Sequence, residues 1–212
     1  MNRPPLSELP TNRWIQEAER DHYRRRARKE GYRSRAAYKL LEAQKKYGLV
    51  KRGDIAIDLG AWPGGISQAL ARMVGAEGLV IAVDRRRFKR FDEQNIITLQ
   101  LDILEDDVVS EVRRILGGKP ADFLVSDASP SFTGIRDIDV LRQIELTERS
   151  YEIARELVRR GGSVMLKALE CGELRELERE LREGFKIVRR FIPKATRRGS
   201  SELYLIGLGK LI

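Results

Sequence analysis

Four aspartates close short apolar stretches of this sequence, and carboxylates at such positions can bind a ligand. The stretches have the length and composition of β-strands, and the aspartates are Asp58, Asp84, Asp102 and Asp127. Aspartate is depleted inside strands, so one at a strand end is ordinary. Open α/β sheets, however, bind their ligands beyond the carboxyl ends of the strands. Four carboxylates in series at that edge therefore predict a ligand site.

A glycine-rich turn follows the first of these strands, which is predicted over residues 55–59. The turn contains Gly60, Gly64 and Gly65 and leads into a helical pattern. A strand, a glycine turn and the start of a helix form the nucleotide-binding unit of an α/β sheet. A plain tight connection between a strand and a helix gives the same pattern. Trp62 stands where a dinucleotide fingerprint needs its second glycine. The indole excludes a diphosphate there and suits a ligand with an apolar or sulfonium portion. No P-loop motif is present.

Two of the carboxylates have positions that fit an adenosine. Asp84 lies 24 residues beyond Gly60, about the separation at which an acid ending the second strand binds ribose hydroxyls. Asp102, which ends the third strand, is expected to reach an adenine amino group. The arginines Arg85 to Arg87 would suit a phosphorylated ribose in a dehydrogenase, but the missing glycine argues against that class.

Two lysines differ in what their surroundings predict. Lys167 stands at the end of an otherwise apolar strand over residues 163–168. A lysine is uncommon at such a position, because burying an ammonium group without partners is costly. Lys39 lies on a helix that Ser34 is expected to cap and Gly48 to close. The spacing of that helix favours an exposed Lys39 near the edge of its buried face.

The net charge of +9 is concentrated in the first quarter of the chain. Between Arg13 and Arg52 there are fourteen Lys and Arg against five Asp and Glu, and the rest of the chain balances. A one-sided excess of this kind is typical of a surface that binds nucleic acid phosphates. The segment lacks the wide apolar face of a membrane-surface helix. We expect a basic helix over residues 12–29, in an N-terminal extension (1–30) that precedes one catalytic domain (31–212).

Composition excludes several kinds of site. Cys171 is the only cysteine and His22 the only histidine, so an intrachain disulfide is excluded, and neither a zinc site nor any other metal site is expected. No stretch of 18 apolar residues and no apolar signal core occur in the sequence. We therefore expect a soluble, cytoplasmic protein that does not bind membranes.

The remaining pattern predicts a three-layer α/β/α fold of Rossmann type. Helices alternate with strands, and Gly161 and Gly162 are expected to end the longest helix. The last two strands are joined without a helix, so the last strand is predicted to be antiparallel in an otherwise mostly parallel, seven-stranded sheet. The later elements are expected as helices over 106–116, 137–160 and 173–182 and strands over 185–192 and 202–208.

From about Asp21 onward, five motifs in order make the chain resemble the FtsJ/RrmJ family of RNA ribose 2′-O-methyltransferases. They are YRSRAAYKLLE (32–42), DLGAWPGGISQ (58–68), VSDASP (125–130), GGSVMLK (161–167) and SSELYL (200–205). The resemblance implies the S-adenosylmethionine-dependent methyltransferase fold and that cofactor. It also implies a catalytic tetrad of Lys39, Asp127, Lys167 and Glu202. The implied cofactor-binding positions are Gly60, Trp62, Asp84, Asp102 and Asp127.

A tetrad of this kind suits methyl transfer to a ribose hydroxyl, which needs alignment of the reacting atoms and removal of a proton. Lys167 is the expected base, although the roles of the two lysines can be exchanged. The resemblance favours ribosomal RNA, with a large-subunit uridine as the site, and a monomer that acts on the assembling subunit. The alternatives are transfer RNA and a non-catalytic RNA-binding or ribosome-associated protein. Trp62 disfavours an oxidoreductase, and Cys171 lies outside every motif, which disfavours cysteine-dependent base methylation.

Overall fold

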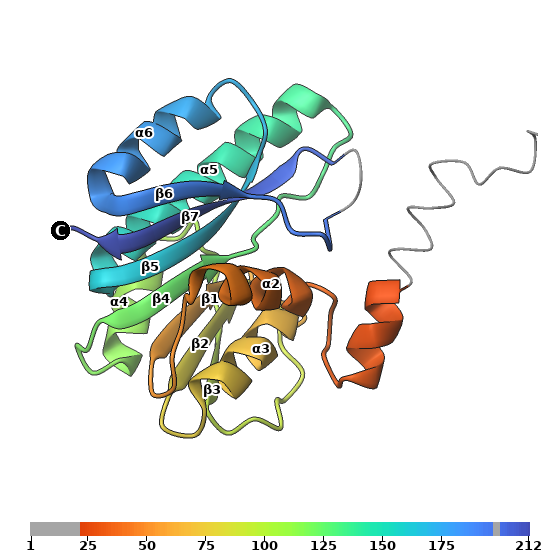
Figure 1. The fold of residues 1–212 in the computed structure, drawn as a ribbon, viewed down its shortest axis with the longest axis vertical. Helices are drawn as coiled ribbons and strands as arrows, with labels where there is room; N and C mark the ends of the chain where they lie inside the picture. Colours follow the sequence, from red (N-terminus) through yellow and green to blue (C-terminus); the bar gives the residue numbers. More distant parts are fainter. Residues whose placement is uncertain (1–21, 197–199) are drawn as a thin grey trace, which may run out of the picture.

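The computed structural model describes residues 22–196 and 200–212, which form a central sheet covered by helices on both faces (Figure 1). The strands are β1 (Ile55–Leu59), β2 (Leu79–Asp84), β3 (Ile96–Gln100), β4 (Ala121–Ser126), β5 (Val158–Leu169), β6 (Phe185–Phe191) and β7 (Glu202–Lys210). The helices are α2 (Ala37–Tyr47), α3 (Gly65–Val74), α4 (Asp107–Ile115), α5 (Arg136–Leu157) and α6 (Leu174–Gly184), and residues 22–29 form a helix before α2. Within the described ranges no helix is long and apolar enough to cross a membrane.

The sheet confirms the predicted fold class. Its strand order is β3-β2-β1-β4-β5-β7-β6, and the strands from β3 to β5 pair in parallel. β7 is antiparallel to both of its neighbours, as predicted for the last strand. Because β7 runs in reverse, its first residues lie at the carboxyl edge of the parallel strands. Tyr204 is paired with Lys167 and Glu202 with Leu169.

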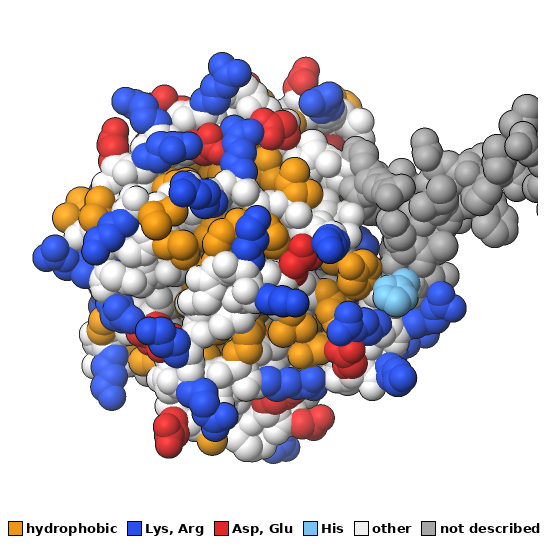
Figure 2. Space-filling model, viewed as in Figure 1, with side chains coloured by type: hydrophobic (Ala, Val, Ile, Leu, Met, Phe, Trp, Pro, Cys, Tyr) orange, Lys and Arg blue, Asp and Glu red, His pale blue; other side chains and the backbone are white. Residues whose placement is uncertain are grey.

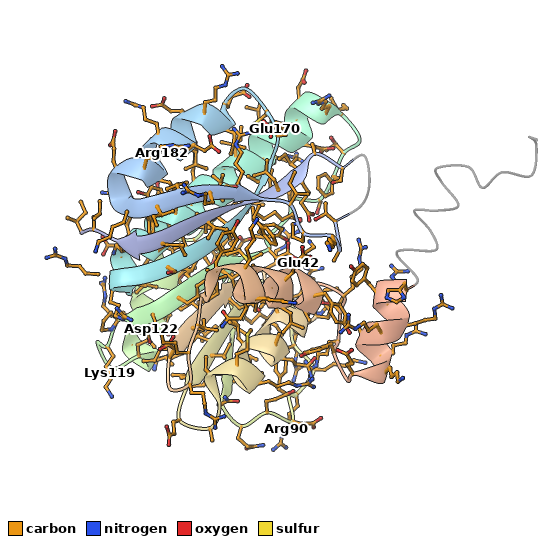
Figure 3. All side chains as sticks on the ribbon, viewed as in Figure 1. Glu42, Arg90, Lys119, Asp122, Glu170 and Arg182 are labelled. Carbon is orange, nitrogen blue, oxygen red and sulfur yellow. The ribbon has the colours of Figure 1, made fainter. Side chains whose placement is uncertain are left out.

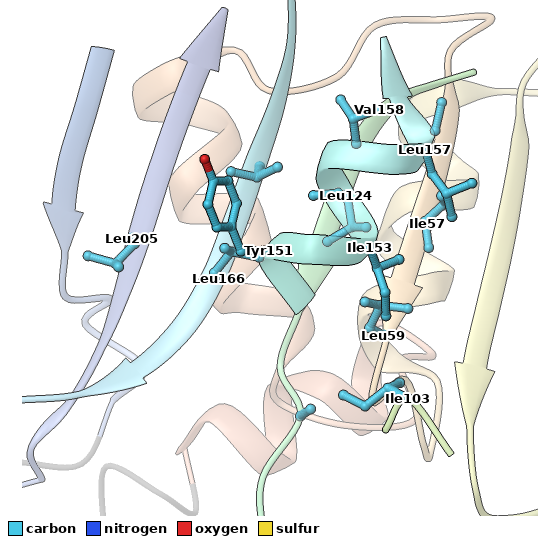
Figure 4. Packing of buried hydrophobic residues seen from close by; sticks show 14 of the residues in the cluster. Ile57, Leu59, Ile103, Leu124, Tyr151, Ile153, Leu157, Val158, Leu166 and Leu205 are labelled. Atoms are coloured by element: carbon cyan, nitrogen blue, oxygen red, sulfur yellow. The ribbon is translucent and has the colours of Figure 1, made fainter. Parts of the chain in front are cut away.

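Two apolar layers hold the sheet between its helices. Ile57, Leu59 and Leu124 point to the layer formed with α4, α5 and α6, where Ile153 and Leu166 join them (Figure 4). The neighbouring residues along the same strands face α2 and α3 on the other side. This alternation follows from the two-residue period of a strand. Full burial of one such aliphatic side chain stabilises the fold by about 1.5–3 kcal/mol, so the sheet is a firm platform for the loops at its edge.

The start of α2 differs from the prediction. Ser34 does not cap the helix, because the first helical residue is Ala37 and the preceding Ala36 makes no side-chain capping bond. The Ser34 hydroxyl is instead buried, and a Cβ at Gly65 would lie 2.3 Å from it. Ser34 thus packs against the start of α3. The other end agrees with the prediction, since Gly48 closes α2 in the left-handed conformation.

The end of α5 also differs from the prediction. The helix stops at Leu157 rather than Arg160, and β5 begins at Val158 and runs through the two glycines that were expected to end the helix. The pairing of β4 with β5 shifts register at this point, and Gly161 adopts a positive φ of 77°. Glycines can therefore mark an irregular strand start as well as a helix end.

The basic helix predicted over residues 12–29 is helical from residue 22, and residues 12–21 lie outside the described part of the chain. Ala27 packs against Tyr38 of α2 and Ala195 of the loop between β6 and β7. In Figure 1 this helix lies beyond α2, on the side where that loop and the carboxyl ends of the parallel strands are found. The positive segment is thus placed beside the edge of the sheet that was predicted to bind a ligand.

Candidate active site

A cavity of about 650 Å³ opens at the carboxyl edge of the sheet. The five residues predicted to bind a cofactor all line it, although they come from four separate segments: Gly60, Trp62, Asp84, Asp102 and Asp127. Ile103 and Leu104 add an apolar wall. The volume is typical of a small-molecule site. We call this space the cofactor cavity.

Gly60 lets two segments approach closely at the floor of the cofactor cavity. Its φ is 69°, and a Cβ at this position would lie 2.5 Å from the Cα of Ala128. No other residue type fits that space without displacement of the backbone. The glycine-rich turn after β1 is therefore pressed against the loop that follows β4, as expected where the backbone itself forms the wall of a ligand site.

Asp84 is held in a fixed orientation at the end of β2. It is 4% exposed, and its carboxylate accepts hydrogen bonds from the backbone N–H of Trp62 at 3.0 Å and of Arg86 at 2.9 Å. The Arg86 guanidinium also contacts this carboxylate and lies 4.2 Å from the centre of the Trp62 ring. Asp102 is more open; one of its oxygens accepts the N–H of Leu104. The carboxylate oxygens of Asp84 and Asp102 therefore lie beside the cofactor cavity as hydrogen-bond acceptors.

Asp58 is the exception among the four aspartates. It lies inside β1, is fully buried and does not line the cofactor cavity. One carboxylate oxygen accepts a hydrogen bond of 2.6 Å from the hydroxyl of Ser67, on α3, and the other has no partner among the described residues. Burial raises the pKa of Asp58 to about 8, against the opposing Ser67 hydrogen bond. Asp58 connects the strand to the helix behind the turn.

The four predicted tetrad side chains meet at the mouth of the cofactor cavity. The ammonium nitrogen (Nζ) of Lys39 lies 2.8 Å from Glu202 and 3.3 Å from Asp127. The Lys167 Nζ lies 3.4 Å from Asp127 and 3.6 Å from Glu202, and it also contacts the Ser129 hydroxyl. The two cations and two carboxylates therefore alternate around a closed group. Lys39 is held by the shorter contacts.

The charges in this group support one another. Burial alone would raise the pKa of Asp127, but the ammonium groups of Lys167 and Lys39 outweigh it and hold that pKa well below its ordinary value. Burial likewise opposes the charged form of Lys39, yet Asp127 and Glu202 outweigh it and raise the pKa of Lys39. Lys39 is thus a firmly charged ammonium group. Its burial corrects the expectation of an exposed lysine.

Tyr204 is a member of the site that the sequence did not reveal. Its hydroxyl donates a hydrogen bond of 2.6 Å to Asp127 and lies 2.9 Å from the Lys39 Nζ. The side chain is fully buried, and burial together with the nearby carboxylates raises its pKa well above its ordinary value. Tyr204 stands two residues after Glu202, so both side chains point to the same face of β7. The two-residue spacing between Glu202 and Tyr204 was the feature of the sequence that could have indicated Tyr204 as a site residue.

The sheet order, the glycine turn pressed on its cavity and the acids at the strand ends define an S-adenosylmethionine-dependent methyltransferase fold. The family described as FtsJ-like methyltransferase matches residues 32–210. The chain belongs to this family. Its cofactor is S-adenosylmethionine, and the cofactor cavity fits it, because carboxylates of Asp84 and Asp102, an apolar wall and a closely packed glycine turn line the space.

Proteins named ribosomal RNA large subunit methyltransferase E are similar to this chain over nearly its whole length. The protein of Methanothermobacter thermautotrophicus is 46% identical over 195 residues, which cover 92% of each chain. That of Acinetobacter baylyi is 37% identical over 197 residues, covering 93% of this chain and 90% of its own. Both similarities therefore cover at least 90% of each chain.

Solved structures agree with the fold. A Plasmodium falciparum protein described as a ribosomal RNA methyltransferase superposes with a TM-score of 0.76 and 29% identity, over 85% of this chain and 99% of its own. Aeropyrum pernix fibrillarin, solved with natively bound S-adenosylmethionine, superposes with a TM-score of 0.54 and 18% identity, over 81% and 76% of the two chains. The second similarity concerns the fold alone.

Proposed function

We propose that this protein transfers the methyl group of S-adenosylmethionine to a ribose 2′-hydroxyl in large-subunit ribosomal RNA, with a uridine as the favoured nucleotide. The observation that carries the proposal is the closed group of Lys39, Asp127, Lys167 and Glu202 at the mouth of the cofactor cavity. The names of the similar proteins support ribosomal RNA as the substrate.

The cofactor supplies a methyl group that is already activated on a sulfonium, so the protein has to position the hydroxyl and accept its proton. Lys167, as the neutral amine, is the better base of the two lysines, because a lysine must first lose its own proton to accept another and the raised pKa of Lys39 opposes that loss. The contacts of Lys167 with the two carboxylates, at 3.4 and 3.6 Å, are also longer than the shortest contact of Lys39. Lys167 lines the cofactor cavity, where the reacting oxygen has to arrive.

The other three tetrad residues act as positioning groups in this proposal. Lys39, held charged, stabilises the oxygen as its proton leaves. Asp127 and Glu202 lie between the Nζ atoms of the two lysines and fix the direction of both side chains. Asp127 also lines the cofactor cavity and thus connects the methyl donor to the base.

The wider setting follows from the same proposal. The protein acts as a monomer in the cytoplasm, on the RNA of an assembling large subunit, without a metal ion. Residues 1–30 form the basic extension and residues 31–212 the catalytic domain, a division close to the residues 32–210 that match the family. Transfer RNA and non-catalytic RNA binding are the alternatives that the test below distinguishes.

Replacement of Lys167 tests the proposal. We expect Lys167→Ala to lower the rate of methyl transfer to large-subunit ribosomal RNA at least about a hundredfold, the usual scale for loss of a general base. Affinity for S-adenosylmethionine, measured by calorimetry, should stay close to wild type. Lys119→Ala is the control, because Lys119 is exposed at the opposite edge of the sheet (Figure 3).

The product identifies the reaction and the RNA. Mapping of 2′-O-methyl groups in total RNA, from cells with and without the gene, should show one large-subunit position that depends on this protein. Methylation found only in transfer RNA would contradict the substrate, and RNA binding without any transfer would favour the non-catalytic alternative. A fully active Lys167→Ala enzyme would assign the base to another group.

A further inference from the structure

A second cavity, of about 580 Å³, lies on the other side of the tetrad from the cofactor cavity. We call it the flanking cavity. Its walls come from the first residue of α5, the end of β5 and the segments around the start of β7, with Arg136, Glu170, Ile192, Ser200, Ser201 and Glu202 among its lining residues. Glu202 belongs to the tetrad, whereas Asp127 and Lys167 line the cofactor cavity. The tetrad therefore separates two spaces of similar volume.

The two carboxylates of the flanking cavity are both in contact with neighbouring cations. Glu170, labelled in Figure 3, forms a two-pronged ion pair with Arg190, with both oxygens 2.8 Å from the same nitrogen. Glu202 contacts the Nζ atoms of Lys39 and Lys167 at 2.8 and 3.6 Å. Each carboxylate of this cavity is therefore in direct contact with a cation, and Arg190 also pairs with Glu178, so that one guanidinium is shared between two carboxylates.

Arg136 makes the flanking cavity attractive to an anion. Its side chain is exposed, and no hydrogen bond or ion pair joins it to any residue in the described ranges. A guanidinium group of this kind binds phosphate oxygens through two parallel N–H donors. Ser200 and Ser201 add hydroxyl groups, and Ile192, 66% exposed, adds an apolar surface. A cation, hydroxyl groups and an apolar surface can together contact the phosphate, the sugar and the base of a nucleotide.

We propose that the flanking cavity binds the nucleotide next to the methylated one in the RNA chain. This inference rests on the proposed function. A ribose 2′-hydroxyl is one carbon away from the 3′-phosphodiester, so a ribose placed at Lys167 carries a phosphate close to the tetrad. In this arrangement Arg136 contacts the phosphate that links the two nucleotides, and Ile192 packs against the neighbouring base. Arg136 is a substrate-binding residue of this chain.

The first test compares two arginine substitutions in the full-length protein, with large-subunit ribosomal RNA and S-adenosylmethionine as substrates. Arg136→Gln should raise KM for the RNA about tenfold, the scale for loss of a charge-assisted hydrogen bond. The kcat and the affinity for the cofactor should stay within about twofold of wild type. The logarithmic salt dependence of RNA binding should fall by roughly 0.7–0.9, as for one phosphate contact. Arg182→Gln, at the exposed far end of α6 (Figure 3), should change none of these values.

The outcomes separate the two proposals. If the wild-type enzyme forms no 2′-O-methyl group, the proposed function fails. If the wild type is active and Arg136→Gln behaves like Arg182→Gln, the function stands and the inference about the flanking cavity is wrong. An Arg136→Gln protein that loses cofactor affinity as well would show a structural role and would also overturn the inference.

The second test places the contact on the RNA. A short RNA that contains the methylated nucleotide is made with one uncharged methylphosphonate linkage at a time. In the wild type, one linkage adjacent to that nucleotide should raise KM about tenfold. In Arg136→Gln the same linkage should have little further effect, because the charge that it would meet is gone. Additive effects of the two changes at every adjacent linkage would contradict the proposal, whatever the effect of the arginine substitution alone.

Discussion

Asp58 carries the largest uncompensated electrostatic cost among the aspartates near the site. Its carboxyl is fully buried in β1 with a single hydrogen-bond donor, Ser67, and its pKa is raised from 3.8 to about 8. The unfolded chain ionises at the lower of these values, so between the two values the folded state binds more protons. Stability is then greatest below the unfolded pKa and declines as the pH rises towards the folded pKa.

Asp58→Asn should remove this dependence, because the amide stays neutral and keeps an acceptor for Ser67. We expect the free energy of unfolding of wild type, relative to Asp58→Asn, to fall by on the order of a few kcal/mol between pH 4 and pH 8. Urea unfolding of both cofactor-free proteins at pH 4, 6 and 8 measures this difference in the free energy of unfolding. Asp92→Asn, at an exposed aspartate, is the matched control. A constant difference across this range would show that Asp58 is ionised in the folded protein at pH 6.

Single residues also show where sequence reasoning was limited. The spacing of α2 favoured an exposed Lys39, since a lysine at the edge of an apolar stripe is usually solvated. The structure buries it to 7% exposure because β7 supplies Glu202 and Tyr204 as partners. No local pattern contains that information. The resemblance to a family did place Lys39 in the site, since it compares whole chains.

At the scale of elements, one residue, Arg33, connects the segment before α2 to the loop after β2 and to α3. The guanidinium of Arg33 lies 3.7 Å from the centre of the Phe91 ring and donates hydrogen bonds to the carbonyls of Lys89, at 2.7 Å, and Arg90. Its backbone N–H binds the side chain of Gln68 on α3. The loop after β2, which carries two cavity-lining arginines, is thus held by an arginine from another part of the chain.

Arg33→Ala should loosen this loop. Removal of one cation–π interaction and three hydrogen bonds, the third to the carbonyl of Pro63, is expected to cost about 1–3 kcal/mol of local stability. Hydrogen exchange of backbone amides over residues 85–95 should accelerate, and affinity for S-adenosylmethionine should fall several-fold. Arg28→Ala, on the exposed side of helix 22–29, is the control. Unchanged exchange over residues 85–95 in Arg33→Ala would show that the loop keeps its position without this arginine.

Whole elements were easier to predict than their boundaries. The apolar stretches that precede or contain Asp58, Asp84 and Asp127 lie in strands as expected, because parallel strands buried on both faces need nearly continuous apolar sequence. The boundary between α5 and β5 was wrong, since tertiary pairing extends β5 across two glycines. The carbonyls of Arg155 and Val158 at that boundary accept hydrogen bonds from the Nζ of Lys210 on β7. A partner so distant in sequence cannot be read from local pattern.

At the scale of the molecule, basic side chains are spread over the face that Figure 2 shows. Figure 2 shows Lys and Arg over much of the face in view, including the end formed by helix 22–29. Arg24, Arg28 and Lys29 are exposed on that helix. Arg26 has a structural role instead, because it pairs with Glu30 at 2.7 Å and lies over the ring of Tyr38. Arg24, Arg28 and Lys29 are therefore the ones to test for RNA binding.

Replacement of Arg24, Arg28 and Lys29 with glutamine should weaken binding to RNA of any sequence. The logarithmic salt slope should fall by roughly 0.7–0.9 for every phosphate that the variant no longer binds. Affinity for S-adenosylmethionine should not change, since the cofactor cavity lies on other segments. Filter binding over a salt series measures the slope. The control set is Lys119, Arg182 and Lys186, exposed at the opposite edge of the sheet. A wild-type slope in the first variant would place the RNA elsewhere on the surface.

The reversed direction of β7 has a consequence for folding kinetics. Lys39 and Tyr204, whose side chains touch, are 165 residues apart in the chain, and Lys39 and Asp127 are 88 apart. Contacts between residues so far apart close long loops and form slowly. The helices and the first parallel strands can assemble before β7 takes its place between β5 and β6, but the tetrad is incomplete until then. In refolding, recovery of methyl transfer should therefore lag behind recovery of helical content and mark completion of the sheet.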